Sequence, residues 1–308
     1  MKVVNFMGQR KLALIFSLTL LAIAAGSLAT KQLNWGLDFT GGTLVEVHYS
    51  ETADLNAIRK TLDAEGYAGA IVVSFGTDKD VLIRLPQGYS DSQGAELLAK
   101  LQDAYSGGVE LRRIEFVGPQ VGDELREQGG LAMLLALGLV MLYIAFRFQF
   151  KFAVGAVVAL IHDVLVVLGF FSVTGMEFDL TVLAALLAVI GYSLNDTIVV
   201  SDRIRENFRK LRKSDPVEVI NISLTETLGR TLVTSLTTML VLMALALFGG
   251  EMINAFAIAL LVGDFIGTYS SIYVAANALL LLGVSKEDMM IQVKEGAEPV
   301  SYTHIRAH

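Results

Sequence analysis

The sequence predicts a polytopic α-helical membrane protein in which six transmembrane helices carry a small α+β domain between the first and second helix. Apolar residues make up 54% of the 308 residues. They gather in runs of about 20 residues, the length at which a helix crosses the hydrocarbon core of a bilayer. Between the first and second run lies a polar stretch with patterns typical of strands. This division predicts a membrane protein with one folded domain outside the bilayer.

The first apolar run covers residues 12–30. It follows a short basic segment, residues 1–11, which carries Lys2, Arg10 and Lys11. Small residues at the end of the run resemble a signal-peptide cleavage site. The run is longer than the apolar core of a secretory signal, however, so we expect an uncleaved first transmembrane helix.

The polar block, residues 31–130, is predicted to fold as a small domain with a connector to the second span. Apolar and β-branched residues predict strands at four places: 43–49, 70–75, 80–85 and 109–117. Apolar residues at helical spacing lie between the first two strands and between the last two, and residues 76–79 suggest a hairpin turn. The order β-α-β-β-α-β is that of a ferredoxin-like domain.

The other spans lie within residues 131–282. Five apolar runs predict them: 131–148, 152–173, 180–201, 229–249 and 253–282. The last run is too long for one straight span, so we expect a tilted helix or one that ends in an interfacial segment. Residues 283–308 form a tail. Its last part, 301–308, differs in character from the acidic segment before it, and we expect it to be disordered or foreign to the native chain.

Basic residues in the short connections set the orientation. They lie between spans two and three and between spans four and five: Arg147, Lys151, Arg203, Arg205, Arg209, Lys210, Arg212 and Lys213. The connection between spans three and four, residues 174–179, has none. Because basic loops stay in the cytoplasm, we expect a multi-pass protein of the bacterial inner membrane with both termini cytoplasmic. Residues 31–130 are then periplasmic.

Composition excludes several classes of function. Residues 31–130 hold nine Lys and Arg against sixteen Asp and Glu, and this net charge of −7 speaks against a nucleic-acid partner. The absence of Cys excludes thiol chemistry and thiolate metal sites. The four histidines form no metal-binding pattern, and neither a Ser-His-Asp arrangement nor a Walker loop is present. We therefore expect no enzymatic activity, no cofactor and no metal.

Two charged residues lie within predicted spans, Asp196 in the fourth and Arg230 in the fifth. Burying an ion in hydrocarbon costs at least ~2.5–3.5 kcal/mol, so such residues usually pair with each other or line a water path. Asn195 makes the surroundings of Asp196 polar, and Arg230 heads a stripe that continues through Thr234 at helical spacing. If the stripe faces Asp196, the pair can serve as a proton relay. The alternative is a static salt bridge, or Arg230 reaching to the lipid headgroups.

Two further aspartates interrupt the spans and are candidate relay residues. Asp163 follows His162 in the third span, and adjacency places the two side chains on different helix faces. Asp163 either lines the same polar interior or makes a buried hydrogen bond to a hydroxyl. Asp264 shares a polar stripe of the last span with Thr268. Beside that stripe lies a pair of glycines with the spacing of a helix–helix contact.

A glycine-rich motif follows the first span and runs from Trp35 through Asp38 to Gly41 and Gly42. Trp35 suits the membrane interface, and paired glycines permit backbone angles that other residues avoid. A tight turn leading into the first strand explains the motif. Phosphate binding does not fit, because no strand precedes the loop and no lysine follows it.

Taken together, these residues resemble the SecF family of bacterial protein-export membrane proteins. The resemblance extends from the first span to about residue 285. It rests on six blocks of sequence: 35–42 (WGLDFTGG), 117–122 (VGPQVG), 191–200 (GYSLNDTIVV), 202–207 (DRIREN), 230–231 (RT) and 263–273 (GDFIGTYSSIY).

The resemblance implies half of a resistance-nodulation-division bundle, which pairs with SecD into a pseudo-symmetric twelve-helix unit. It implies association with the SecYEG channel, with YajC and with translocating unfolded preproteins, and energy taken from the proton gradient rather than from ATP. Asp196 and Arg230 match the residues of the family's proton-conducting interface. The domain after the first span matches the periplasmic part that helps draw secretory polypeptides outward.

Three functions remain open from the sequence. The first is a proton-driven helper of preprotein export, and the second is a small-molecule/proton antiporter of the same superfamily. The third is a structural subunit whose buried charges only hold helices together. An antiporter is expected to carry a substrate pocket lined by aromatic residues in a large exterior domain. Here the exterior block is only about 100 residues long.

Overall fold

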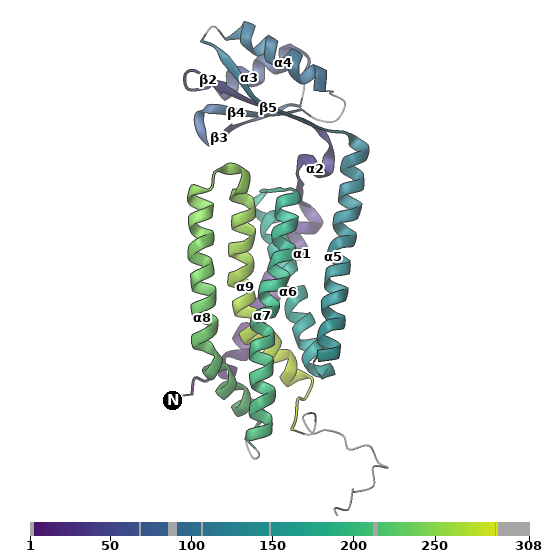
Figure 1. Ribbon diagram of the computed structural model, residues 1–308, viewed down its shortest axis with the longest axis vertical. Coiled ribbons are helices and arrows are strands. Elements are labelled where there is room, and N and C mark those ends of the chain that lie inside the picture. Colours follow the sequence, from purple (N-terminus) through teal and green to yellow (C-terminus); the bar gives the residue numbers. More distant parts are fainter. Residues whose placement is uncertain are drawn as a thin grey trace, which may run out of the picture.

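A bundle of long helices carries an α+β domain at one end, as the computed structural model shows (Figure 1). The structure describes residues 3–67, 69–85, 91–105, 107–147, 149–211, 215–286 and 288. Six helices in this part of the chain are long and apolar enough to cross a membrane. They are α1 (Arg10–Thr30), α5 (Pro119–Arg147), α6 (Phe150–Thr174), α7 (Leu180–Lys210), α8 (Pro216–Phe248) and α9 (Glu251–Leu281), with a short 3-10 helix η1 (Met7–Gln9) before α1. The predicted fold class is confirmed, while residues 301–308 lie outside the described part.

Several helices extend well beyond the apolar runs that predict them. α5 begins at Pro119 rather than at residue 131, and α8 begins at Pro216 rather than at residue 229. Proline favours the first helical position, because the N–H that it lacks has no helical partner there. Asp215 caps α8 by accepting a hydrogen bond from Val217 N over 3.2 Å. Hydropathy marks the apolar stretch of such a helix, whereas these local signals mark where it begins.

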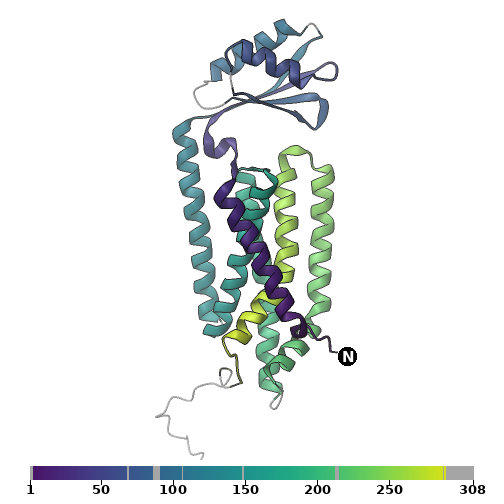
Figure 2. The same ribbon diagram turned by 180° about the vertical axis from the view of Figure 1, so that it is seen from behind.

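The domain between α1 and α5 is a four-stranded antiparallel sheet covered on one face by two helices (Figures 1 and 2). Its elements are β2 (Gly42–Tyr49), α3 (Leu55–Ala64), β3 (Ile71–Phe75), β4 (Thr77–Leu85), α4 (Asp91–Ala104) and β5 (Val109–Val117). The strands lie in the order β3-β4-β2-β5. Val45, Val47 and Ile83 point from the sheet into a core to which α3 adds Leu62 and α4 adds Leu97. The element order agrees with the predicted β-α-β-β-α-β arrangement, and the uncovered sheet face is turned toward the bundle.

The β3–β4 hairpin is tighter than the sequence predicts. Phe75 pairs with Thr77 across Gly76, whose φ of 74° lets the chain reverse at a single residue. β4 therefore begins at Thr77 instead of residue 80, and Asp80 already pairs with His48 of β2.

Helices α6, α7 and α9 form the centre of the bundle. In their most apolar stretches 61%, 44% and 56% of the residues are buried, against 11% in α1 and α5 and 17% in α8. The outer helices expose their apolar side chains, as helices that face lipid or another protein do. α7 and α9 approach closely at the glycine pair, where a methyl group on Gly267 would lie 3.1 Å from Ser193 Cβ. This agrees with the interpretation of the pair as a helix contact.

The chain between α1 and β2 runs back toward the start of α7. It forms β1 (Asn34–Trp35) and the one-turn helix α2 (Leu37–Thr40), and β1 pairs in parallel with β6 (Glu177–Phe178). The tight turn predicted for residues 35–42 is thus a helical turn. Gly41 closes it at φ 67° and Gly42 follows at φ 131°. Residues with side chains rarely adopt these angles, so both glycines are required where α2 leads into β2.

The crossing of α1 and α6 generates a prediction at Gly169. A methyl group there would lie 2.2 Å from the Cβ and 2.6 Å from the Cα of Ala24. Because the backbone of α1 cannot move aside as a flexible side chain can, we expect Gly169→Ala to lower the free energy of unfolding by ~1–3 kcal/mol. Thermal denaturation of the protein in detergent measures this change.

Gly138→Ala in α5 is the matched control. A methyl group on Gly138 would meet no atom within 4 Å, and alanine favours a helix over glycine. An equal loss of stability in the two variants would contradict the close α1–α6 contact.

Candidate functional site

Three membrane-spanning helices bring a set of polar side chains together inside the bundle. Asp196 of α7 and Asp264 of α9 are each 9% exposed, and their carboxylates are near enough to interact electrostatically. Ser235 of α8 donates to Asp196 Oδ2 over 3.4 Å, and its Oγ lies 2.6 Å from Thr268 Oγ1. These four residues are called the membrane cluster below. The structure therefore brings Asp196, Asp264 and Thr268, three of the predicted site residues, to one place.

Asp264 is the least satisfied member of the membrane cluster. Within the described part of the chain, no donor lies within hydrogen-bond distance of its buried Oδ2. An unpartnered buried acceptor costs roughly 1–3 kcal/mol, and more when it is charged. Such a group in a native structure requires an explanation, for example a chemical role. The carboxylate pair with its unpartnered oxygen is thus where the cluster can accept a proton.

Asp163 of α6 is held by hydrogen bonds of its own. Its Oδ2 accepts from Ser193 Oγ over 2.6 Å and from Ser270 Oγ over 2.7 Å. Its Oδ1 lies 2.9 Å from Nδ1 of His162. His162 and Asp163 were expected on different helix faces. Because α6 is central, both side chains are buried, and they contact each other within the packed interior. Of the two roles open to Asp163, this geometry matches the hydrogen bond to hydroxyls.

Arg230 lies outside the membrane cluster, on the exposed side of α8. Among the described residues it makes no ion pair within 4.0 Å with Asp196, although the two charges interact over a longer distance. Thr234 is exposed too, and its hydroxyl donates to carbonyl oxygens of its own helix, at Arg230 and Thr231. Asn195 is exposed on α7. The stripe that was expected to face Asp196 therefore faces away from the bundle interior.

The residue of α8 that meets Asp196 is Ser235, which the sequence interpretation missed. Ser235 directly follows Thr234, and a step of one residue turns a helix by about 100°. The spacing of polar residues gives the stripe but not the rotation of the helix within the bundle. The available signal was the hydroxyl of Ser235 itself, next to the charged stripe in an apolar span.

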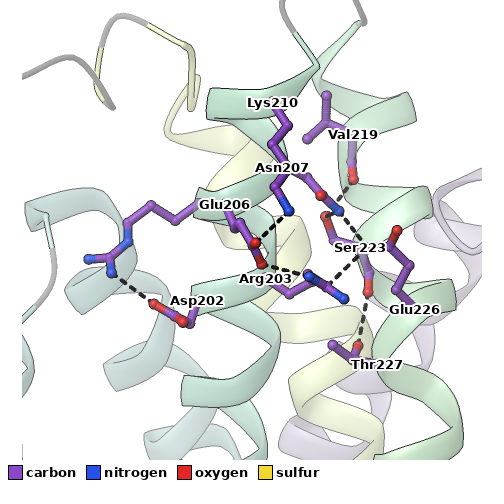
Figure 3. Close-up of polar contacts among 10 residues, drawn as sticks. Asp202, Arg203, Glu206, Asn207, Lys210, Val219, Ser223, Glu226 and Thr227 are labelled. Carbon is purple, nitrogen blue, oxygen red and sulfur yellow. Dashed lines mark hydrogen bonds and ion pairs between the residues drawn. The ribbon is translucent and has the colours of Figure 1, made fainter.

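A second set of charged and polar side chains joins the last turns of α7 to α8 (Figure 3). Arg203 of α7 lies between two carboxylates, with Nη1 2.6 Å from Glu206 Oε2 and Nε 3.0 Å from Glu226 Oε2 of α8. Asn207 donates to the same Glu226 oxygen over 2.8 Å and to Ser223 Oγ over 3.0 Å. Arg203, Glu206, Asn207 and Glu226 are called the end cluster below. It ties α7 to α8 where both leave the apolar region.

An open pocket of about 350 Å³ extends from the end cluster into the bundle surface. Its lining includes Arg203 and Glu226, and also Arg230, which lies about one helical turn along α8 from Glu226. One pocket thus joins the end cluster to the side of α8 that carries Arg230.

The remaining predicted residues lie elsewhere. Asp38, Gly41 and Gly42 are at the domain end of α7, remote from the membrane cluster. In the described ranges, no group of three or more His, Cys, Asp or Glu side chains is arranged to hold a metal ion. His304 and His308 fall outside those ranges.

Comparison with known proteins identifies relatives that cover almost the whole chain. Residues 97–285 match the family model described as protein export membrane protein SecD/SecF, C-terminal, and residues 26–53 match the SecD/SecF GG motif. The protein translocase subunit SecF of Vibrio alginolyticus is 52% identical over 96% of both chains. That of Pseudomonas aeruginosa is 54% identical over 93% of this chain and 94% of its own.

Solved structures give the same result. The crystal structure of SecDF, a translocon-associated membrane protein from Thermus thermophilus, matches 92% of this chain with a TM-score of 0.83 and 40% identity. SecDF in its super-membrane-facing form matches with a TM-score of 0.70. The present chain spans only 39% of the length of either SecDF chain.

The hydrogen bonds of Asp163 generate a prediction. We expect Ser193→Ala and Ser270→Ala each to lower the free energy of unfolding by ~1–3 kcal/mol, because each removes a donor from a fully buried carboxylate. Thermal denaturation in detergent measures the loss. Thr237→Ala is the control, since that exposed hydroxyl bonds to carbonyls of its own helix. Three equal melting temperatures would show that Asp163 does not depend on its donors.

Proposed function

The chain belongs to the SecF family of protein translocase subunits, and from this premise we propose how its buried charges serve protein export. The chain acts with SecD as an accessory, non-enzymatic subunit of Sec-dependent translocation. It uses the proton gradient to promote the export of preproteins across the inner membrane. The observation that carries the proposal is the membrane cluster, a pair of carboxylates held inside a bundle of membrane-spanning helices.

The membrane cluster has the properties of a proton-binding site. Two carboxylates that share a buried site repel each other when both are ionised, and a proton on either of them relieves the repulsion. Asp196 and Asp264 are so placed, with Ser235 as the hydroxyl that bridges to Thr268. In the proposed cycle, Asp196 takes up and releases the proton, and Arg230 stabilises its ionised form when the two side chains approach.

The exposed side of α7 and α8 supports SecD as the partner. Asn195, Arg230 and Thr234 present polar groups on a surface that is otherwise apolar. A cation at membrane depth is costly in lipid, so such residues normally face another protein or water. We propose that SecD, as the other part of a SecDF unit, packs against this surface. The SecYEG channel, YajC and the translocating preprotein are proposed partners on the family resemblance.

The orientation follows from the two ends of the bundle. The N-terminus and the last turns of α7, which carry most of the end cluster, lie at the end of the bundle opposite the α+β domain (Figures 1 and 2). Because basic connections remain in the cytoplasm, we place the end cluster and both termini there. The domain within residues 31–130 is then periplasmic, where an emerging polypeptide can meet it.

Two alternatives are weaker. The names of the relatives favour export over small-molecule antiport. A purely structural role fits Asp163, whose oxygens are all hydrogen-bonded, but it does not explain the unpartnered oxygen of Asp264.

The relay generates a prediction for Asp196→Asn and Arg230→Met. Each variant is expected to reduce the part of preprotein export that depends on the proton gradient to the level of vesicles without SecDF. Asp196→Asn removes the carboxylate that takes up the proton, and Arg230→Met removes the cation that stabilises its ionised form. Export into inverted membrane vesicles with and without a gradient measures this, at equal abundance of the subunit.

Asp179→Asn is the matched control on the same helix. Asp179 caps α7 by accepting from Val182 N over 2.8 Å, and asparagine caps a helix equally well. Lost export with an intact SecD complex supports the relay. Unchanged export, or loss of the complex itself, would favour the structural subunit.

The orientation generates a second prediction, which uses the absence of Cys from the chain. Ser74→Cys places a thiol on the exposed edge of the domain, and Arg209→Cys places one at the far end of α7. A membrane-impermeant maleimide is expected to label the Ser74→Cys variant in spheroplasts and the Arg209→Cys variant only in inverted vesicles. The reverse pattern would overturn the orientation.

A further inference from the structure

The α+β domain is joined to the bundle by more than its two covalent connections. Two acidic side chains and one basic side chain connect the domain, α2 and the start of α7. They are Asp38, Glu177 and Arg84. They are called the latch below. Each belongs to a different element, so the latch fixes the relative positions of the sheet, α2 and the connection that precedes α7.

Arg84 is the part of the latch that belongs to the sheet. It lies in β4 opposite Leu44 of β2 and Ile71 of β3, so both neighbouring strands hold its backbone. From the sheet face turned toward the bundle, Nη1 reaches Glu177 Oε1 over 3.2 Å. Its Nη2 donates to Trp35 O over 3.0 Å and to Thr40 Oγ1 over 3.1 Å.

Asp38 and Glu177 hold α2 against the start of α7. Asp38 Oδ2 accepts from the backbone N–H of Leu180, the first residue of α7, over 3.0 Å. A carboxylate at this position is favourable, because the first N–H groups of a helix lack helical partners. In return, Glu177 Oε1 accepts from Leu37 N over 3.3 Å. The two carboxylates thus bind the first turns of two helices to one another.

Close packing around the latch restricts movement of α2 against α5 and the start of α7. A methyl group on Gly36 would lie 2.8 Å from Asp179 Cβ, and one on Gly122 of α5 would lie 2.9 Å from Gly41 N. Trp35 packs edge-on against Phe178 with ring centroids 5.7 Å apart. Close backbone contacts of this kind transmit a displacement rather than absorb it.

Helix α7, whose first residue is hydrogen-bonded to the latch, also carries Asp196. α7 runs without interruption from Leu180 to Lys210, and Asp196 lies about 24 Å along it from Leu180 at the rise of an α-helix. We propose that the latch is the positioning device that couples the protonation state of the membrane cluster to the position of the exterior domain. This inference rests on the proposed function. Asp38, Arg84 and Glu177 act through α7, and they bind neither the proton nor the preprotein.

The test separates proton movement from protein export. Arg84→Met, Glu177→Leu and Asp38→Ala are placed in the full chain, assembled with SecD and SecYEG in vesicles. Proton flux and gradient-driven preprotein export are measured side by side. We expect proton flux to remain, while the stimulation of export by the gradient falls about five-fold or more, the scale of a lost coupling between sites. Arg84→Lys, which keeps the charge, is expected to restore part of the stimulation.

Arg112→Met is the matched control, an exposed arginine of β5 on the same sheet. Spin labels on the variants Ser74→Cys and Leu247→Cys report the distance between the domain and the bundle. We expect the distance distribution to broaden in the latch variants and to stay unchanged in Arg112→Met.

Unchanged export, or export and proton flux that fall in parallel, would overturn the latch. If the unmodified complex moves no protons, the proposed function fails, and the distance distribution alone decides whether the latch holds the domain.

Discussion

The structure depends on holding ionisable groups inside a bundle of apolar helices. A carboxylate is tolerated there only where the protein supplies donors, an opposite charge or a path for water. Asp163 has donors on both oxygens, from helices that form the centre of the bundle. Asp264 shares its site with a second carboxylate and leaves one oxygen unpartnered. The donors around them thus distinguish two aspartates of one bundle. Asp163 is satisfied by its neighbours, whereas Asp264 is the one that the proposed function uses.

The arginine that could balance the charge of Asp196 lies at the surface of the bundle. Arg230 interacts with Asp196 only at long range and lines a pocket on the outer surface of the bundle. The charge that can balance Asp196 therefore lies at the boundary of this chain rather than in its core. On the proposed function, SecD covers that boundary. A relay at such an interface can change its water access when the two bundles move, which a relay sealed in one core cannot do.

The sequence predicted the fold class and the order of strands because both depend on local periodicity. Runs of about 20 apolar residues and alternating strand patterns are present whatever the tertiary packing. The rotation of each helix is not local, so Thr234 was chosen where Ser235 faces Asp196. The tight packing that turns His162 toward Asp163 was equally hidden. The contact of Arg84 with Glu177 joins residues 93 positions apart, and no pattern in either segment points to the other. The sequence did identify the candidate carboxylates, because a charged residue within an apolar run can be recognised without knowledge of its contacts.

The latch and the membrane cluster lie on one continuous helix, and their chemistry suits different tasks. The Arg84–Glu177 pair contributes little to stability, because the Glu177 side chain is 43% exposed and ion pairs in contact with water are worth ~1 kcal/mol or less. The Arg84–Glu177 contact therefore serves to position the domain rather than to stabilise the fold. The membrane cluster is the opposite, since a change of charge in a buried site is energetically large. On the proposed function, the strong event within the membrane therefore moves α7, and the weak contacts at its outer end determine where the domain follows.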